Sequence, residues 1–217
     1  MIRLPGMKGV FALIISFLIL IWILSGVFFF DRWNRLMQFS EIKISLVSAK
    51  VSFNEYIDYL GVRYVNPDSG LITAPENPEK AAAELVALQS SFDIFENSVP
   101  FISDPPSTRK IRTIKENLNE LNRLANDFKN LAGQLKAQQV DALQAERIFH
   151  KIGSQDKGGI LGDFFIHVKL IENLMDELYD FTSDFLSDYY KTYKTRLILL
   201  LIISCALICI VLYYFGN

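Results

Sequence analysis

Residues 10–30, VFALIISFLILIWILSGVFFF, and residues 197–215, LILLLIISCALICIVLYYF, are uncharged apolar stretches near the two ends of the chain. Each has roughly 20 residues, which at ~1.5 Å rise per residue makes about 30 Å of helix. This length matches the hydrocarbon core of a bilayer, so both stretches are predicted to be transmembrane helices. The segment between them must therefore begin and end at the membrane.

Length and composition limit what the remaining chain can be. The protein has 217 residues, 51% of them hydrophobic, and a net charge of −2. Outside the two apolar stretches about 165 residues remain, enough for one domain with its own core. The charge balance provides no basic stripe, so nucleic acid is not an expected partner. Both cysteines, Cys205 and Cys209, lie in the second apolar stretch without the further ligands that a zinc site requires.

The first stretch is longer than the 7–15-residue apolar core of a signal peptide, so an uncleaved anchor is predicted. Arg3 and Lys8 favour a cytoplasmic N-terminus over residues 1–9, which places residues 31–196 outside the cytoplasm. Five basic residues on the other side of the two stretches favour the opposite orientation: Arg32, Arg35, Lys191, Lys194 and Arg196. Long domains are translocated largely regardless of charge, so an extracytoplasmic domain is expected. A cytoplasmic bundle on a membrane hairpin remains the alternative.

Four apolar seams divide residues 31–196. In each, apolar residues recur in steps of three and four, the spacing of packed helices. The first seam is Phe39, Ile42, Leu46, Ala49, Phe53, Tyr56 and Leu60, and a neighbouring stripe, Ile44, Val47 and Val51, is expected to widen its buried face. The others begin at Ala81, Ile111 and Leu161. Four passes return the chain to the membrane, so the predicted fold is all-α, an antiparallel up-down four-helix bundle flanked by two transmembrane helices.

Turn and capping residues place the boundaries of these helices. Residues 61–77 contain two prolines and two glycines and are expected to form a distal loop, and Asn77 followed by Pro78 predicts the start of the second helix. Ser107 is predicted to cap the third helix. That helix should bend or break between residues 133 and 141. The fourth starts near Ile160 and runs without Gly or Pro from residue 163 into the second apolar stretch, as the first helix runs out of the first stretch.

Catalytic signatures are nearly absent. The sequence has no P-loop, GxGxxG, HExxH or GxSxG motif, and its two histidines, His150 and His167, have no evident partner. Neither enzymatic activity nor a cofactor is therefore expected in this chain. Candidate ligand-binding residues are cationic or polar groups near loops, and an ordinary solvated charge is the alternative reading for each: Arg63, Tyr64, Arg109, Arg112, Arg147 and His150.

The layout of two anchors around four seams resembles the periplasmic sensor regions of bacterial transmembrane receptors. These receptors include sensor histidine kinases, chemoreceptors and membrane diguanylate cyclases with all-helical input modules. One passage adds to the resemblance: AERIF at residues 145–149, then GSQD at residues 153–156, then Phe164 and Phe165. It is similar to an E-x-x-F, short Gly-Asp turn and aromatic sequence at the corner between the third and fourth helices of such modules.

The resemblance implies a homodimeric receptor in the bacterial inner membrane, with a small ligand or a periplasmic binding protein as its stimulus. Displacement of the fourth helix, with Phe185, Tyr189 and Tyr193 near the membrane, would carry the signal through the second span. Unlike the family, the sequence ends at residue 217 without a kinase or cyclase. It is therefore expected to be the input half of a longer receptor, and the alternative is a two-span scaffold or envelope-complex subunit whose bundle docks a partner.

Overall fold

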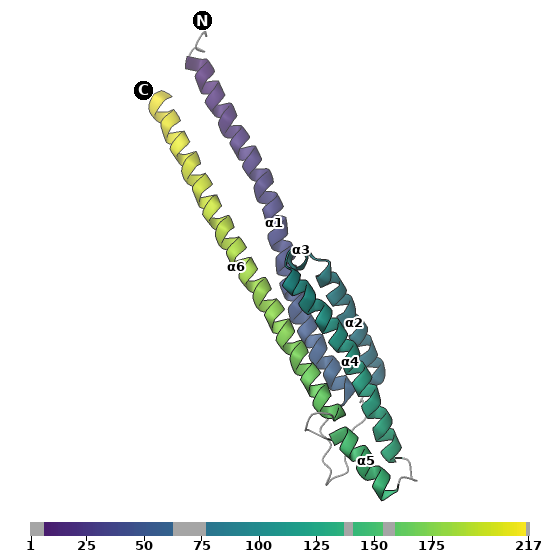
Figure 1. Ribbon diagram of the computed structural model, residues 1–217. Helices are drawn as coiled ribbons and strands as arrows, with labels where there is room; N and C mark the ends of the chain where they lie inside the picture. The colour runs from purple at the N-terminus through teal and green to yellow at the C-terminus, as the bar shows by residue number, and fades with distance from the viewer. Residues whose placement is uncertain (1–6, 63–76, 137–140, 154–158, 216–217) are drawn as a thin grey trace. The chain divides into compact units, whose positions relative to one another are not determined.

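The computed structural model describes residues 7–62, 77–136, 141–153 and 159–215, and within these ranges every regular element is an α-helix. The helices are α1 (Met7–Leu60), α2 (Pro78–Glu96), α3 (Val99–Ile102), α4 (Pro105–Lys136), α5 (Ala142–Gly153) and α6 (Ile160–Phe215) (Figure 1). The predicted all-α class is confirmed. The distal loop lies outside the described residues except at its ends, where Gly61 ends α1 with a positive φ of 62°, a conformation that glycine adopts without strain.

α1 and α6 are single helices of 54 and 56 residues. Each contains an apolar window whose mean hydropathy, 1.9 in α1 and 2.1 in α6, is high enough for a membrane span. None of the α1 window and 6% of the α6 window is buried within the protein. An apolar surface that the chain leaves uncovered needs an apolar surrounding, so these helices support a membrane location. The predicted continuity of the two apolar stretches with the helical residues beside them is confirmed.

The chain divides into two compact units. One, which we call the helix-pair unit, consists of Met1–Glu41 and Ser183–Asn217, and the other, the core unit, is Ile42–Thr182. The helix-pair unit contains the apolar parts of α1 and α6. The core unit contains the remainder of these helices together with α2 to α5.

The hydrophobic core belongs to the core unit and follows the predicted seams. Phe53, Phe92, Phe128 and Phe164, one from each of four helices, are fully buried. Polar contacts link these helices around the core: Lys80 of α2 lies over the Tyr59 ring of α1, Gln89 of α2 donates to Asn119 of α4, Lys110 of α4 pairs with Glu177 of α6, and Lys50 of α1 pairs with Asp176 of α6.

The stripe that was expected to widen the buried face of the first helix is exposed. Ile44, Val47 and Val51 are 64%, 48% and 53% accessible, whereas Leu46 and Phe53 of the seam are 3% and 0% accessible. The prediction was wrong because the residues of the stripe lie on roughly the opposite side of the helix, at about 100° of rotation per residue. The core therefore needs only a narrow stripe of α1.

The structure confirms the predicted N-cap of α2 and corrects the predicted N-cap of α4. The Asn77 side chain accepts a hydrogen bond from the Lys80 backbone N–H at 3.0 Å. At α4 the capping oxygen belongs to Asp104, which accepts from the backbone N–H of Ser107 at 3.1 Å and from its hydroxyl. Ser107 was predicted to be the cap, but the helix begins two residues before it, at Pro105.

The expected interruption of the third helix is present. α4 ends at Lys136 and α5 begins at Ala142, where Asp141 Oδ1 accepts from the backbone N–H groups of Leu143 and Gln144. α5 contributes one fully buried residue, Ile152, to the core. The single predicted helix is therefore two helices, and a short helix, α3, precedes α4.

Candidate functional site

Aromatic side chains join α1 to α6 within the helix-pair unit, beyond the apolar stretches. The Phe39 ring of α1 lies 4.7 Å from the Phe185 ring and 6.0 Å from the Tyr189 ring, centroid to centroid. Phe185 and Tyr189 are stacked at 6.2 Å, one helical turn apart on α6. Phe39 is buried. We call Phe39, Phe185 and Tyr189 the aromatic junction, because rings from both long helices meet in it.

A cation lies beside this junction. The Arg32 guanidinium carbon is 4.6 Å from the Phe28 ring centroid and 5.5 Å from that of Tyr189, so the cation contacts an aromatic ring of each helix. Such cation–π contacts contribute about 0.5–1 kcal/mol at exposed sites and more where water is excluded. Phe29 packs edge-on against Tyr193 at 5.2 Å. Two of the three residues predicted to transmit a signal, Phe185 and Tyr189, thus lie in the junction, and Tyr193 contacts α1 nearby.

The Tyr189 hydroxyl is buried and has no hydrogen-bond partner among the described residues. A buried unpaired hydroxyl costs about 1–3 kcal/mol. Tyrosine is therefore less favourable here than phenylalanine would be in the same packing. The junction contains no acid–base pair or nucleophile, so its chemistry is packing and cation–π attraction between two helices.

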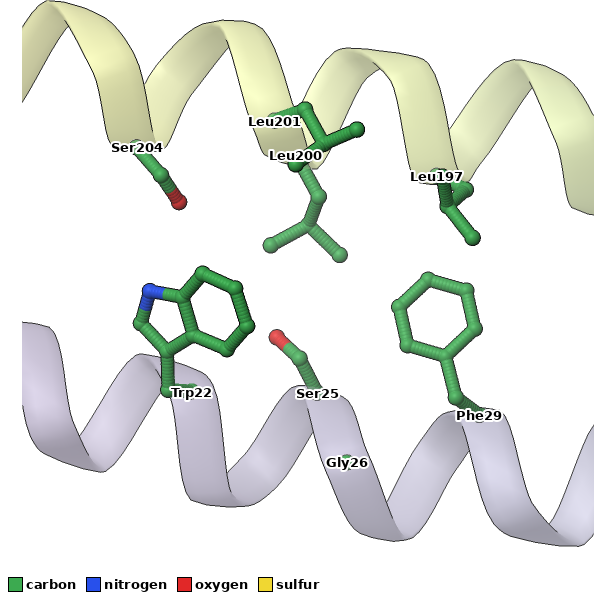
Figure 2. Close-up of a pocket in the computed structure, with 8 residues that line it drawn as sticks. All are labelled: Trp22, Ser25, Gly26, Phe29, Leu197, Leu200, Leu201 and Ser204. Atoms are coloured by element: carbon green, nitrogen blue, oxygen red, sulfur yellow. The ribbon is translucent and has the colours of Figure 1, made fainter.

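Between the apolar parts of α1 and α6 lies a cavity of about 230 Å³ (Figure 2). Its walls are Trp22, Ser25, Gly26 and Phe29 from α1 and Leu197, Leu200, Leu201 and Ser204 from α6. Figure 2 shows the side chains of the two helices pointing towards one another across it. The Ser25 hydroxyl donates to the Ile21 carbonyl at 2.6 Å, the usual way in which a serine satisfies itself within an apolar helix. Apart from small hydroxyls and an indole the lining is apolar, so the cavity suits an apolar group.

The predicted ligand-binding residues that the structure describes lie on two helices, α4 and α5. Arg63 and Tyr64 lie outside the described residues. Arg147 and His150 are exposed on α5, and Arg109 is exposed at the start of α4. Arg112 donates through Nε to Glu96 Oε1 at 2.6 Å, so it already binds a carboxylate of the chain itself. That Arg109 and Arg112 clamp a ligand carboxylate, and that Arg147 and His150 bind a ligand, stay predictions.

A charge network links α2 and α4 around Glu96. Lys115 Nζ donates to Glu96 Oε2 at 3.0 Å and also pairs with Asp93. The hydrogen bonds from Arg112 and Lys115 lower the pKa of Glu96, and the bonds to Asp93 and Glu96 raise the pKa of Lys115. Because each cation is matched by a carboxylate, the network stabilises the contact between the helices and offers no uncompensated charge to an anionic ligand.

A second polar pair connects α4 and α6. His167 Nδ1 contacts Asn117 Oδ1, and Asn117 Nδ2 donates to the Thr113 carbonyl at 2.6 Å. Because the amide nitrogen already donates, the amide oxygen accepts, and His167 Nδ1 carries the proton. No partner for His167 could be identified from the sequence. No spacing signal could have shown one, because Asn117 lies 50 residues earlier on another helix.

In the part of the chain that the structure describes, no group of three or more His, Cys, Asp or Glu side chains is placed to hold a metal ion. Comparison with known proteins adds no assignment: no protein-family model matches the sequence, and no curated protein or solved structure matches it. Any functional conclusion therefore rests on the two long helices and the contacts between them.

Proposed function

We propose that this chain is the sensory input module of a bacterial transmembrane receptor, with residues 31–196 on the periplasmic side of the inner membrane. Residues 10–30 and 197–215 would be its two spans, and residues 1–9 and 216–217 would face the cytoplasm. A ligand or partner protein would bind outside and shift α6 against α1, and the second span would carry the displacement inward. A sensor histidine kinase is the output that we favour.

The observation that carries this proposal is the continuity of α1 and α6. Each helix runs unbroken from core-unit residues, such as Phe53 and Phe164, into an apolar stretch long enough to span a membrane. A continuous helix transmits an axial shift or a rotation, whereas a flexible linker would absorb it. A domain that is only anchored has no need of such continuity, so the helices favour a mechanical role.

The contacts of the core unit support a four-helix input domain. α1, α2, α4 and α6 each contribute to one core, and each of the four neighbouring pairs has a polar contact. We propose an antiparallel up-down bundle of these helices, in which α1 and α6 are neighbours. A shift of α6 relative to α1 requires two packings of similar energy that a ligand binds with different affinities. The aromatic junction provides ring surfaces that can exchange such packings.

Two exposed apolar residues on α2, Val86 and Ile94, favour a second candidate function. Each is 65% accessible. With Arg112 and Lys115 already engaged by the chain's own carboxylates, a protein partner fits the described surface better than a small anion does. In this second reading the chain is a two-span scaffold or envelope-complex subunit that docks a partner and transmits nothing.

Sequencing the gene beyond codon 217 separates the two functions. The receptor proposal expects a coupling helix pair followed by a kinase or cyclase domain in the same reading frame. A stop codon at that point would contradict it and favour the scaffold.

Cysteine labelling tests the orientation separately. In a chain with Cys205 and Cys209 replaced by alanine, Ser90→Cys, exposed on α2, should react with a membrane-impermeant maleimide in intact spheroplasts. A matched Asn217→Cys should react only after permeabilisation. The reverse pattern would place the core unit in the cytoplasm and refute the proposed periplasmic location.

A further inference from the structure

α1 carries apolar side chains on two opposite faces within the core unit. Leu46, Ala49 and Phe53 face the core, whereas Ile44, Val47 and Val51 are 64%, 48% and 53% accessible. We call the last three the outer stripe. Single exposed apolar residues are ordinary, but three in succession on one side of a helix mark an interaction face.

The spacing of the outer stripe is that of a helix–helix seam. Its residues are separated by three and then four positions, which matches the a and d positions of a heptad. Ile44 and Val51 occupy the a positions, where β-branched residues are typical of two-stranded parallel coiled coils, and Val47 stands at the d position, where those coiled coils carry leucine. The seam therefore fits another helix packed lengthwise against α1.

The charges beside the outer stripe indicate which helix. Lys43 and Lys50 lie along one edge of the stripe and Ser48 and Glu55 along the other. Asp176 of α6 pairs with Lys50 and keeps that side chain at the lysine edge of the stripe. When two copies of α1 lie parallel, the lysine edge of each faces the Glu55 edge of the other, and Lys50 of one copy comes opposite Glu55 of its partner. An antiparallel arrangement would instead bring lysine edges together.

We propose that a second copy of this chain packs on the outer stripe, with the two α1 helices parallel and in register. The interface is isologous, so each stripe residue lies across the two-fold axis from its own counterpart. Two copies inserted the same way in one membrane already run in the same direction. The seam is short, so the membrane's effect of concentrating the copies contributes to association. This inference does not depend on the proposed signalling role.

Disulfide cross-linking of the full chain in membranes tests the arrangement. In the Cys205→Ala/Cys209→Ala background, Ile44→Cys and Val51→Cys should each form a disulfide-linked dimer on mild oxidation. Val86→Cys, an equally exposed valine position on α2, is the matched control and should remain monomeric under the same conditions. Cross-linking of Val86→Cys to the same extent would overturn the proposal.

Mixed samples distinguish the direction of packing. If Ile44→Cys links only to Val51→Cys, and neither links to itself, the helices are antiparallel and the proposal is wrong. If the stripe positions link neither to themselves nor to each other, the stripe does not bind a second copy, and the proposal is wrong.

A charged substitution provides a second measurement. Val47→Glu should raise the dissociation constant of the dimer in detergent by at least about tenfold, because a carboxylate replaces apolar surface at the seam. Val86→Glu should leave it unchanged. Both positions are exposed, so the helical content and the melting temperature, followed by circular dichroism, should match those of the parent. An unchanged dissociation constant for Val47→Glu would also overturn the proposal.

Discussion

Tyr56 of α1 is a completely buried side chain of the core unit, and its hydroxyl has no hydrogen-bond partner among the described residues. Burial raises the pKa of its phenol, because the charged form would lose its hydration.

We expect Tyr56→Phe to leave the free energy of unfolding unchanged or to raise it by up to about 1 kcal/mol, because it removes an unpaired buried hydroxyl and keeps the ring. Urea unfolding measures the change. Phe53→Ala, which should lower the free energy by about 3–5 kcal/mol, confirms that the assay is sensitive to the core. A loss above about 1 kcal/mol in Tyr56→Phe would mean that the hydroxyl is bonded.

Glu96 links stability to pH. Hydrogen bonds from Arg112 and Lys115 lower its pKa in the folded protein. A carboxyl group whose pKa is lowered by folding stabilises the protein above its unfolded-state pKa, and this contribution disappears as the pH falls through the lower, folded-state pKa. We expect Glu96→Gln to lower the free energy of unfolding by about 0.5–1 kcal/mol at pH 7, since the group is partly exposed.

At pH 3 the difference in unfolding free energy between the parent and Glu96→Gln should be smaller than at pH 7. Urea unfolding at the two pH values checks it, and Glu116→Gln, an exposed carboxylate on α4, is the control. If the difference in unfolding free energy between the parent and Glu96→Gln is the same at both pH values, Glu96 is not the source of the pH dependence.

The sequence predicted which residues are buried better than it predicted which residues meet. Steps of three and four identified Leu46 and Phe53 as core positions because a helix buries one face. The same spacing says nothing about which helix covers that face. The contacts of Arg112 with Glu96 and of Asn117 with His167 therefore could not be derived, since each joins residues on different helices.

At the scale of elements, the helix N-termini show which capping residues can be identified from the sequence and which are ambiguous. Asn77 was identified as a cap because a single candidate precedes Pro78. Before α4 the sequence offers both Asp104 and Ser107, with two prolines between them. Proline fits the first turn of a helix, whose N–H groups have no intrahelical partner, so the helix starts at Pro105 and Asp104 caps it.

We expect Asp104→Ala to lower the free energy of unfolding by about 1–2 kcal/mol, because the backbone N–H and the hydroxyl of Ser107 both lose their acceptor. Ser107→Ala keeps the cap and should cost less than half as much. Thermal or urea unfolding of the two variants measures the difference. An equal or greater loss in Ser107→Ala would restore serine as the cap.

Helix α6 is the element on which the receptor proposal depends. Asp184 is exposed in its interior, so proline there interrupts the helix, at about 3 kcal/mol locally, without removing a core side chain. We fuse the chain after residue 217 to a reporter kinase and compare Asp184→Pro with Asp184→Ala. The proline variant should show the kinase output of a fusion that lacks residues 42–182, and the alanine variant should retain that of the parent. Parental output from Asp184→Pro would refute transmission along α6.

For the whole molecule, two long apolar helices and a helical segment between them could be predicted, because hydropathy and helical periodicity can be read along the sequence. The division into two units could not be predicted, because it depends on which residues far apart in the sequence contact one another. The core cluster is drawn entirely from residues between Leu46 and Leu178. The contacts of Phe39 with Phe185 and Tyr189 lie entirely within the helix-pair unit. The core cluster and the aromatic junction are thus each built within one unit.

This separation predicts that residues 42–182 fold without the membrane helices. The fragment keeps Phe53, Phe92, Phe128 and Phe164, each fully buried, so it should lose no core contact on excision. We expect it to be soluble without detergent and to unfold cooperatively, with coincident transitions in far-UV and near-UV circular dichroism. A fragment that binds a hydrophobic dye and lacks a near-UV signal would be a molten globule, and the prediction would fail. If residues 31–195 fold where residues 42–182 do not, the aromatic junction belongs to the folding unit, and the core is larger than its own contacts indicate.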